Sequence, residues 1–182
     1  MDSKSHGVIQ SHRSRPLESN RTNRMEAARN TYSTLKEPEM NEKPYHELIP
    51  NLYMCGAKDV NQLIQEQGID VVVDLRAEVD PSELTPLNIT RVHAPLEDHA
   101  EGTEESQMKE AIHAVVTHHQ AGKKVAFHCG AGRGRTGAVA VGTLMELKLA
   151  SDIDEALSKA REARSILKMN EAQRATLMRL YP

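Results

Sequence analysis

A glycine-rich stretch at residues 128–137 (HCGAGRGRTG) is the feature that most constrains how this chain can fold. It follows a short apolar run and leads into a long apolar segment, so we expect it to join a buried strand to the N-terminus of a helix. In such a turn, successive backbone N–H groups converge on one point and the helix dipole adds positive potential there. The stretch therefore predicts an anion-binding loop.

Two side chains give this loop a chemistry of its own. Cys129 opens it, and Arg135 follows six positions later. Backbone donors and a helix N-terminus lower the pKa of such a thiol, while the planar guanidinium of Arg135 offers two donors to phosphate oxygens. Thr136 is placed to hydrogen-bond Cys129 and to stabilise it as a leaving thiolate. The residues expected to surround a phosphate are Gly130, Ala131, Gly132, Arg133, Gly134 and Arg135.

Two other phosphate-binding loops compete for the same residues. Residues 132–137 match the dinucleotide fingerprint G-x-G-x-x-G. That fold needs a following strand that ends in an acidic residue about 20 positions on, whereas residues 151–155 read as a helix start. The Walker pattern also fails, because no Lys-Ser or Lys-Thr pair closes the loop. A phosphate-binding loop with a cysteine nucleophile is thus the favoured interpretation.

Length and composition indicate whether the protein is membrane-spanning, secreted or cytoplasmic. The 182 residues predict one domain with a tail, and no apolar run approaches the length of a membrane-spanning helix. The N-terminus lacks the apolar region of a signal peptide. The two cysteines, Cys55 and Cys129, form neither a disulfide framework nor a metal motif. We therefore expect a cytoplasmic protein with no integral membrane association.

Charge and hydropathy divide the chain near residue 44. Residues 1–44 hold eight basic and six acidic residues, against fifteen and twenty in residues 45–182. Because the first segment has almost no apolar periodicity, we predict a disordered polar tail; alternatively, translation starts at Met25 or Met40 and the tail is an artefact. The acidic balance of residues 45–182 argues against nucleic-acid binding.

Periodicity predicts an α/β domain over residues 45–182, with a central, mainly parallel mixed sheet flanked by helices. The expected strands are a turn and strand within 48–56, then 69–75, 89–93 and 124–128. The expected helices are 59–67, closed by Gly68, then 104–120, 137–149, 152–164 and 170–180. The helix at 137–149 is apolar nearly all round and should be buried.

The string His-Cys-x-x-Gly-x-x-Arg-Thr at residues 128–136 resembles the signature of the cysteine-dependent protein tyrosine phosphatase superfamily. The order of elements, with residues 49–56 and 68–75 as the first strands, is similar to that of its dual-specificity branch. The resemblance covers residues 45–182 and implies a phosphomonoester hydrolase that forms a cysteinyl-phosphate. It implies no metal or cofactor, since the loop and Arg135 supply the charge stabilisation.

The resemblance also implies roles outside the loop. The family carries its general acid about 30 residues before the cysteine, and Asp98 lies 31 positions before Cys129, with Glu97 as the alternative. His128 is expected to order the loop by hydrogen bonding. Gln173 matches the glutamine that positions the hydrolytic water; alternatively it is a helix-surface residue. His99, His118 and His119 are expected to be ordinary loop and helix residues.

The sequence does not decide between several classes of substrate. The sequence shows no segment for the aromatic-walled phosphotyrosine pocket of the tyrosine-specific branch, which favours a shallow site for phosphotyrosine and phosphoserine/threonine proteins. Arg133 adds a second positive charge inside the loop, so a phosphoinositide or inositol phosphate is the alternative substrate. A catalytically weak phosphate-binding module is a third interpretation. Whether Cys55 regulates Cys129 through a disulfide is also left open.

Overall fold

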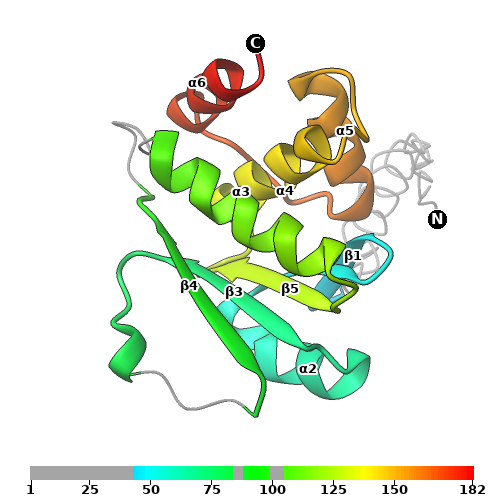
Figure 1. Ribbon diagram of the computed structural model, residues 1–182, viewed down its shortest axis with the longest axis vertical. Coiled ribbons are helices and arrows are strands. Elements are labelled where there is room, and N and C mark those ends of the chain that lie inside the picture. Colours follow the sequence, from blue (N-terminus) through cyan, green and yellow to red (C-terminus); the bar gives the residue numbers. More distant parts are fainter. Residues whose placement is uncertain (1–42, 84–87, 99–104) are drawn as a thin grey trace, which may run out of the picture. The chain divides into compact units, whose positions relative to one another are not determined.

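The computed structural model describes residues 43–83, 88–98 and 105–182, and the predicted tail therefore lies almost entirely outside the described residues. The strands are β1 (Tyr45–Ile49), β2 (Leu52–Gly56), β3 (Val71–Arg76), β4 (Thr90–Leu96) and β5 (Val125–Cys129) (Figure 1). The helices are α2 (Val60–Gln67), α3 (Glu105–Gln120), α4 (Gly134–Glu146), α5 (Ile153–Ala163) and α6 (Glu171–Leu180), with 3-10 turns at η1 (Ala57–Asp59) and η2 (Pro81–Glu83).

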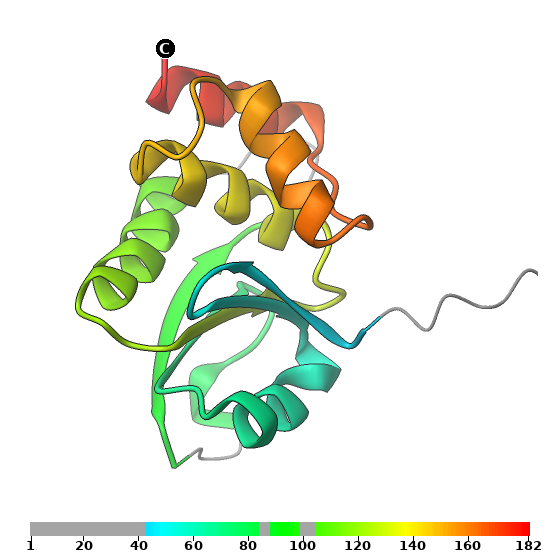
Figure 2. The same ribbon diagram turned by 90° about the vertical axis from the view of Figure 1, so that its right-hand side faces the viewer.

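The strands form one mixed sheet in the order β1-β2-β5-β3-β4. All neighbours pair in parallel except β1, which runs antiparallel to β2. One face of the sheet carries α2, and the other carries α3 to α6 (Figures 1 and 2). This arrangement confirms the predicted α/β class. It also brings the carboxyl ends of β3, β4 and β5 to one edge of the sheet, where parallel α/β folds place their sites.

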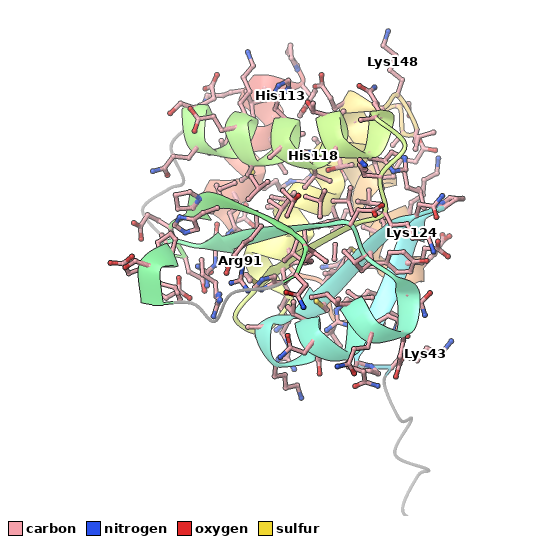
Figure 3. The ribbon with its side chains drawn as sticks, turned by 60° about the horizontal axis from the view of Figure 1, so that its bottom comes forward. Lys43, Arg91, His113, His118, Lys124 and Lys148 are labelled. Atoms are coloured by element: carbon pink, nitrogen blue, oxygen red, sulfur yellow. The ribbon has the colours of Figure 1, made fainter. Side chains whose placement is uncertain are left out.

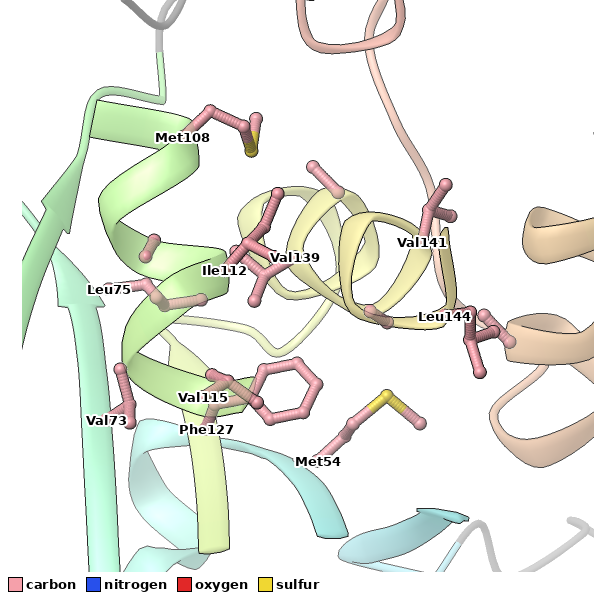
Figure 4. Close-up of a cluster of buried hydrophobic side chains, with 14 of the residues drawn as sticks. Met54, Val73, Leu75, Met108, Ile112, Val115, Phe127, Val139, Val141 and Leu144 are labelled. Carbon is pink, nitrogen blue, oxygen red and sulfur yellow. The ribbon is translucent and has the colours of Figure 1, made fainter. Parts of the chain in front are cut away.

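The larger core lies between the sheet and the four helices α3 to α6. Helix α4 passes through this core, and its residues from position 135 to 144 are all buried. Figure 4 shows side chains of α3, α4 and the strands meeting there, with Phe127 from β5 among them. An all-round apolar sequence is typical of such a central helix. The buried position of α4 fixes the loop that precedes it.

A smaller core lies under α2, on the opposite face. Val60 and Leu63 of α2 pack there against Cys55 and Val72 of the sheet. Gly68 ends α2 in the left-handed conformation (φ 64°), and its N–H donates to the Ile64 carbonyl. The predicted glycine cap is therefore confirmed, and both faces of the sheet are covered.

The first strand of the domain was not predicted from the sequence. The sequence pattern placed a turn at its start, but the structure has a β1–β2 hairpin, so strand β1 (Tyr45–Ile49) was missed. Asn51 takes the left-handed conformation (φ 67°) in the turn, and its N–H donates to Glu47 Oε1 at 2.9 Å. β1 was missed because its residues are half-buried and include the polar His46 and Glu47, which blur the strand pattern.

Element boundaries also differ at the loop. Helix α4 begins at Gly134 rather than Gly137, because the last loop residues already form its first turn. It ends at Glu146 instead of Leu149, whose side chain is 43% exposed. Helices α5 and α6 begin with Asp152 and Asn170 as N-caps, each accepting a hydrogen bond from the backbone three residues on. Within the described ranges, no helix has the length and apolarity needed to cross a membrane.

Candidate active site

The glycine-rich loop connects β5 to α4 at the carboxyl edge of the sheet. Cys129 is the last residue of β5 and is only 3% exposed. Its N–H donates to Thr136 Oγ1 at 3.1 Å, and the Thr136 hydroxyl in turn donates to Cys129 Sγ at 3.2 Å. Thr136 thus closes the loop onto the sulfur, where a hydroxyl donor stabilises developing negative charge.

Three neighbouring elements hold the loop from outside through its carbonyl groups. The Ala57 N–H donates to the Gly130 carbonyl at 2.9 Å. Arg164, at the end of α5, donates from Nε to the Gly132 carbonyl at 3.1 Å. The Lys168 N–H lies 3.3 Å from the Arg133 carbonyl. Carbonyls engaged from outside are what an anion-binding loop requires, since its N–H groups then face inward.

Gly132 is the loop position that most needs a glycine. It takes φ 66°, and a Cβ there would lie 2.4 Å from the Cys55 carbonyl oxygen, a backbone atom that cannot turn away. A left-handed conformation alone costs an alanine about 1–2 kcal/mol. We expect Gly132→Ala to lower the free energy of unfolding by more than this, because β2 must also move.

Gly122→Ala is the matched control for that change. Gly122 has a similar φ of 76°, and nothing lies within 4 Å of its Cβ position. Urea unfolding of both variants isolates the steric part of the cost. Equal losses in the two variants would contradict the close approach of the loop to β2.

Arg135, in the first turn of α4, is 3% exposed and turns its guanidinium toward the carboxyl edge of the sheet. Its two terminal nitrogens donate to both carboxylate oxygens of Glu78, with NH2 to Oε1 at 2.9 Å, and NH1 also donates to the Leu96 carbonyl at 3.2 Å. Its Nε is buried without a partner in the described structure. An unsatisfied buried donor in such a loop is suited to an incoming phosphate oxygen.

Asp98 follows β4 and meets the loop from the neighbouring strand end. Its carboxylate Oδ2 lies 3.4 Å from Arg135 NH2, and its side chain is 60% exposed. Asp98 Oδ1 is also 3.5 Å from where a Cβ on Gly134 would stand. The Asp98 carboxylate, which lies 31 positions before Cys129 in the sequence, therefore shares one edge of the sheet with the Cys129 thiol and the Arg135 guanidinium.

The sequence matches the family of dual specificity phosphatase catalytic domains over residues 52–181. The chain belongs to this family. It is accordingly a cysteine-dependent phosphatase of the dual-specificity type, as the resemblance of residues 128–136 implied. No curated protein matches the chain significantly.

Several solved structures share the fold at low sequence identity. A mouse putative dual specificity phosphatase superposes with a TM-score of 0.67 and 21% identity, covering 81% of this chain and 92% of that chain. Human DUSP28 gives a TM-score of 0.65 and 18% identity, covering 76% and 93%. PTPMT1 in complex with PI(5)P gives 0.64 and 14% identity, covering 76% and 94%.

Gln173 lies beside the phosphatase loop rather than on the helix surface. It is 1% exposed, in the first turn of α6. Its Oε1 accepts from the Asn170 N–H at 3.1 Å, whereas its Nε2 is buried without a partner in the described structure. That nitrogen is 4.0 Å from the Cβ position of Gly134. Asn170 and Gln173 together form the capping box of α6, which uses Oε1 of Gln173 and leaves its Nε2 as a free donor beside the loop.

Other predicted residues lie around the same loop. His128 is buried, and its Nδ1 is 3.2 Å from the Cys129 carbonyl oxygen. Arg133 is exposed at the start of α4. Glu97, the alternative acid, is also exposed. His99 lies outside the described residues, and His118 and His119 end α3 near the amino end of β5, remote from the loop (His118 is labelled in Figure 3).

Cys55 and Cys129 are both free and belong to different cores. Cys55 pairs with His128 in the sheet, so its side chain is on the α2 face, opposite that of Cys129. Burial raises the pKa of Cys55 to about 12. A direct disulfide between the two thiols would therefore need β2 or β5 to be rearranged.

Glu78 is the residue of this site that sequence reasoning missed. It follows β3, and its bidentate contact with Arg135 spans 57 positions. The one available signal was its place just after a parallel strand, where site residues gather. The hydrogen bond from Arg135 lowers the pKa of Glu78 to about 2, so this carboxylate is ionised at neutral pH.

We expect Glu78→Gln to lower kcat/KM by about tenfold, the lower end of what removing an orienting partner costs. The amide keeps one acceptor oxygen but places an NH2 donor where the second carboxylate oxygen accepted from Arg135, so the bidentate contact is lost and the guanidinium loses its fixed plane. Steady-state kinetics measure the effect, with Glu110→Gln, an exposed carboxylate of α3, as a charge-matched control. Unchanged kinetics for Glu78→Gln would show that the Leu96 carbonyl orients Arg135 without help.

Proposed function

We propose that this dual specificity phosphatase acts on phosphotyrosine and phosphoserine/threonine side chains of proteins through a cysteinyl-phosphate intermediate. The observation that carries the proposal is the convergence of three groups at one sheet edge. Thr136 donates to Cys129 Sγ, and Asp98 lies 3.4 Å from Arg135 NH2. These are the nucleophile, the anion-binding guanidinium and the acid that phosphomonoester cleavage requires.

In the first step, the Cys129 thiolate attacks phosphorus and the bond from phosphorus to the substrate oxygen breaks. Asp98 gives its proton to that oxygen, which leaves as a neutral alcohol or phenol. The loop N–H groups and Arg135 hold the other phosphate oxygens, where charge develops in the transition state. The buried, unpartnered Nε of Arg135 supports this role.

In the second step, water attacks the cysteinyl-phosphate and Asp98 takes a proton from it. The bond between sulfur and phosphorus breaks, and the hydroxyl of Thr136 stabilises the departing thiolate, as its 3.2 Å contact with Sγ favours. Gln173 orients this water through its Nε2, a role that the buried and unpartnered position of this nitrogen beside Gly134 supports.

The aromatic side chains of the described residues support a shallow site. Tyr45 and Tyr53 pack edge to face against each other, with ring centroids 6.5 Å apart. Phe127 is in the core, and Tyr181 donates to Glu146. No aromatic ring among the described residues is thus assigned to walling a deep phosphotyrosine pocket, and an open site also accepts short phosphoserine and phosphothreonine side chains.

A phosphoinositide is the second candidate substrate, favoured by Arg133. The side chain of this loop arginine is exposed. It would supply a cation beside the loop for a further phosphate on an inositol ring. The fold shared with PTPMT1, solved in complex with PI(5)P, is consistent with this candidate.

Phosphate release in EDTA from a phosphotyrosine peptide, a phosphoserine peptide and a soluble phosphoinositide separates these functions. We expect faster release from the peptides, with Arg133→Gln changing their turnover less than twofold. Preference for the inositide, lost in Arg133→Gln, would establish the second candidate. Release no faster than that of Cys129→Ser from all three would overturn the proposed function.

A further inference from the structure

A fully buried carboxylate lies beneath the loop and has no part in the steps above. Asp74, on the central strand β3, has an exposed fraction of 0%. Carboxylates are almost never fully buried unless they are paired. Its position next to the last residues of β5 calls for an explanation beyond stability, because a buried ion pair adds little stability over apolar packing.

Two arginines hold this carboxylate in place. Arg76 donates to it from Nε at 2.9 Å and from NH2 at 2.7 Å, and its backbone N–H lies 3.2 Å from Oδ1. Arg91 of β4, labelled in Figure 3, brings NH1 to 3.5 Å from Oδ2. Although burial opposes ionisation, the hydrogen bonds from Arg76 keep the pKa of Asp74 below its usual range. The group is therefore an anion with a fixed orientation.

The same carboxylate faces His128, the residue before the nucleophile. Asp74 and His128 are direct partners in the parallel pairing of β3 with β5. Asp74 Oδ2 lies 3.6 Å from His128 Nε2, and the other ring nitrogen, Nδ1, lies 3.2 Å from the Cys129 carbonyl oxygen. A carbonyl only accepts, so Nδ1 must carry the proton in this contact. Nε2 has no hydrogen-bond partner among the described residues, and its 3.6 Å contact with the carboxylate is favourable only when the ring is protonated at both nitrogens, the form that the Asp74 charge stabilises.

We propose that Asp74 is a positioning residue for the phosphatase loop, which orients His128 so that its Nδ1–H holds the Cys129 carbonyl. The proposal rests on the function of Cys129 proposed above and adds a residue from another strand to it. Asp74 touches neither substrate nor sulfur, since its side chain is on the sheet face opposite that of Cys129. The His128 ring is the part of the loop that its carboxylate faces.

The charges around His128 predict a signature that packing alone would not produce. Burial lowers the pKa of His128, with Arg76 and Arg91 adding to this, while Asp74 opposes it. These groups on β3 and β4 are the charges that face the ring, and Cys55 of β2 is its neutral neighbour. Removing the Asp74 charge must therefore move the titration of His128 to lower pH.

A double-mutant cycle of Asp74→Asn with His128→Asn tests the proposal. We expect Asp74→Asn to lower kcat/KM by about 10- to 100-fold, as losses of orienting partners do, mostly through kcat. In the His128→Asn background, the same change should cost less than twofold. Asp70→Asn is the matched control: it joins β3 to β5 at their other end, through the Lys124 N–H at 2.8 Å (Lys124 is labelled in Figure 3), and should leave kinetics unchanged.

NMR titration of the His128 ring gives a readout independent of turnover. We expect its midpoint to fall in Asp74→Asn and to stay unchanged in Asp70→Asn. If Asp74→Asn folds poorly, Asp74→Asn with Arg91→Gln removes one charge of each sign and should show the same kinetic loss. Additive losses in the cycle, or an unmoved His128 titration, would overturn the proposal. An inactive wild-type protein with the expected NMR shift would instead refute the proposed function and leave the Asp74–His128 coupling standing.

Discussion

Replacing Cys129 with serine is expected to lower kcat by about 10⁴-fold or more, the scale seen when a covalent nucleophile is removed. A serine hydroxyl is far less ionised than a thiol in the same loop. The hydroxyl can still accept from Thr136, which donates to Cys129 Sγ at 3.2 Å, and the loop keeps its shape. Phosphorylated substrate should therefore still bind. Turnover assays, with calorimetric binding of a phosphotyrosine peptide, measure both halves of this prediction.

The other thiol of the chain supplies the control. Cys55 is buried on the opposite face of the sheet, so Cys55→Ala should retain turnover within a few-fold. Turnover that survives in Cys129→Ser but disappears in Cys55→Ala would contradict the assignment of the nucleophile.

The second large effect is expected at Asp98. Changing it to asparagine removes the proton donor without changing the size of the side chain, and general acids contribute about 10²- to 10⁴-fold. The loss should be large for phosphoserine, whose alkoxide leaves poorly. It should be much smaller for an aryl phosphate whose phenol is acidic enough to leave without a proton.

Glu97→Gln is the neighbouring control for Asp98→Asn. Both residues are exposed carboxylates after β4, but Asp98 is the one placed 3.4 Å from Arg135 NH2. A larger loss in Glu97→Gln would assign the acid to Glu97. Equal losses of Asp98→Asn on good and poor leaving groups would show that Asp98 acts only by orienting Arg135.

The loop was accessible from sequence because all its parts are local. Residues 128–137 hold the nucleophile, the arginine, the glycines and the threonine in one string, and a strand and a helix flank them. The buried strands β3 and β5 were also predictable from the sequence, since a strand covered on both faces is apolar throughout. The antiparallel β1 was not, because half-buried residues follow no clear alternation.

The partners of the loop were harder to find because they depend on how distant strands are paired. Glu78 meets Arg135 across 57 positions, and Asp74 meets His128 only through the β3–β5 register. Either acidic residue, read alone, is an ordinary charge near a strand end. Gln173 was hard to place for the same reason. Its position three residues after Asn170 indicates a helix cap, but the sequence does not indicate that its free Nε2 lies beside the loop.

Detection of the phosphorylated enzyme tests whether Cys129 is the nucleophile. Wild-type protein is mixed with a phosphotyrosine peptide, quenched in acid within milliseconds, digested and analysed by mass spectrometry. We expect a phosphoryl group on the peptide that carries Cys129, with none in Cys129→Ser. A burst of tyrosine peptide without any phosphoryl-cysteine, or a phosphoryl group on another residue, would show that Cys129 is not the nucleophile.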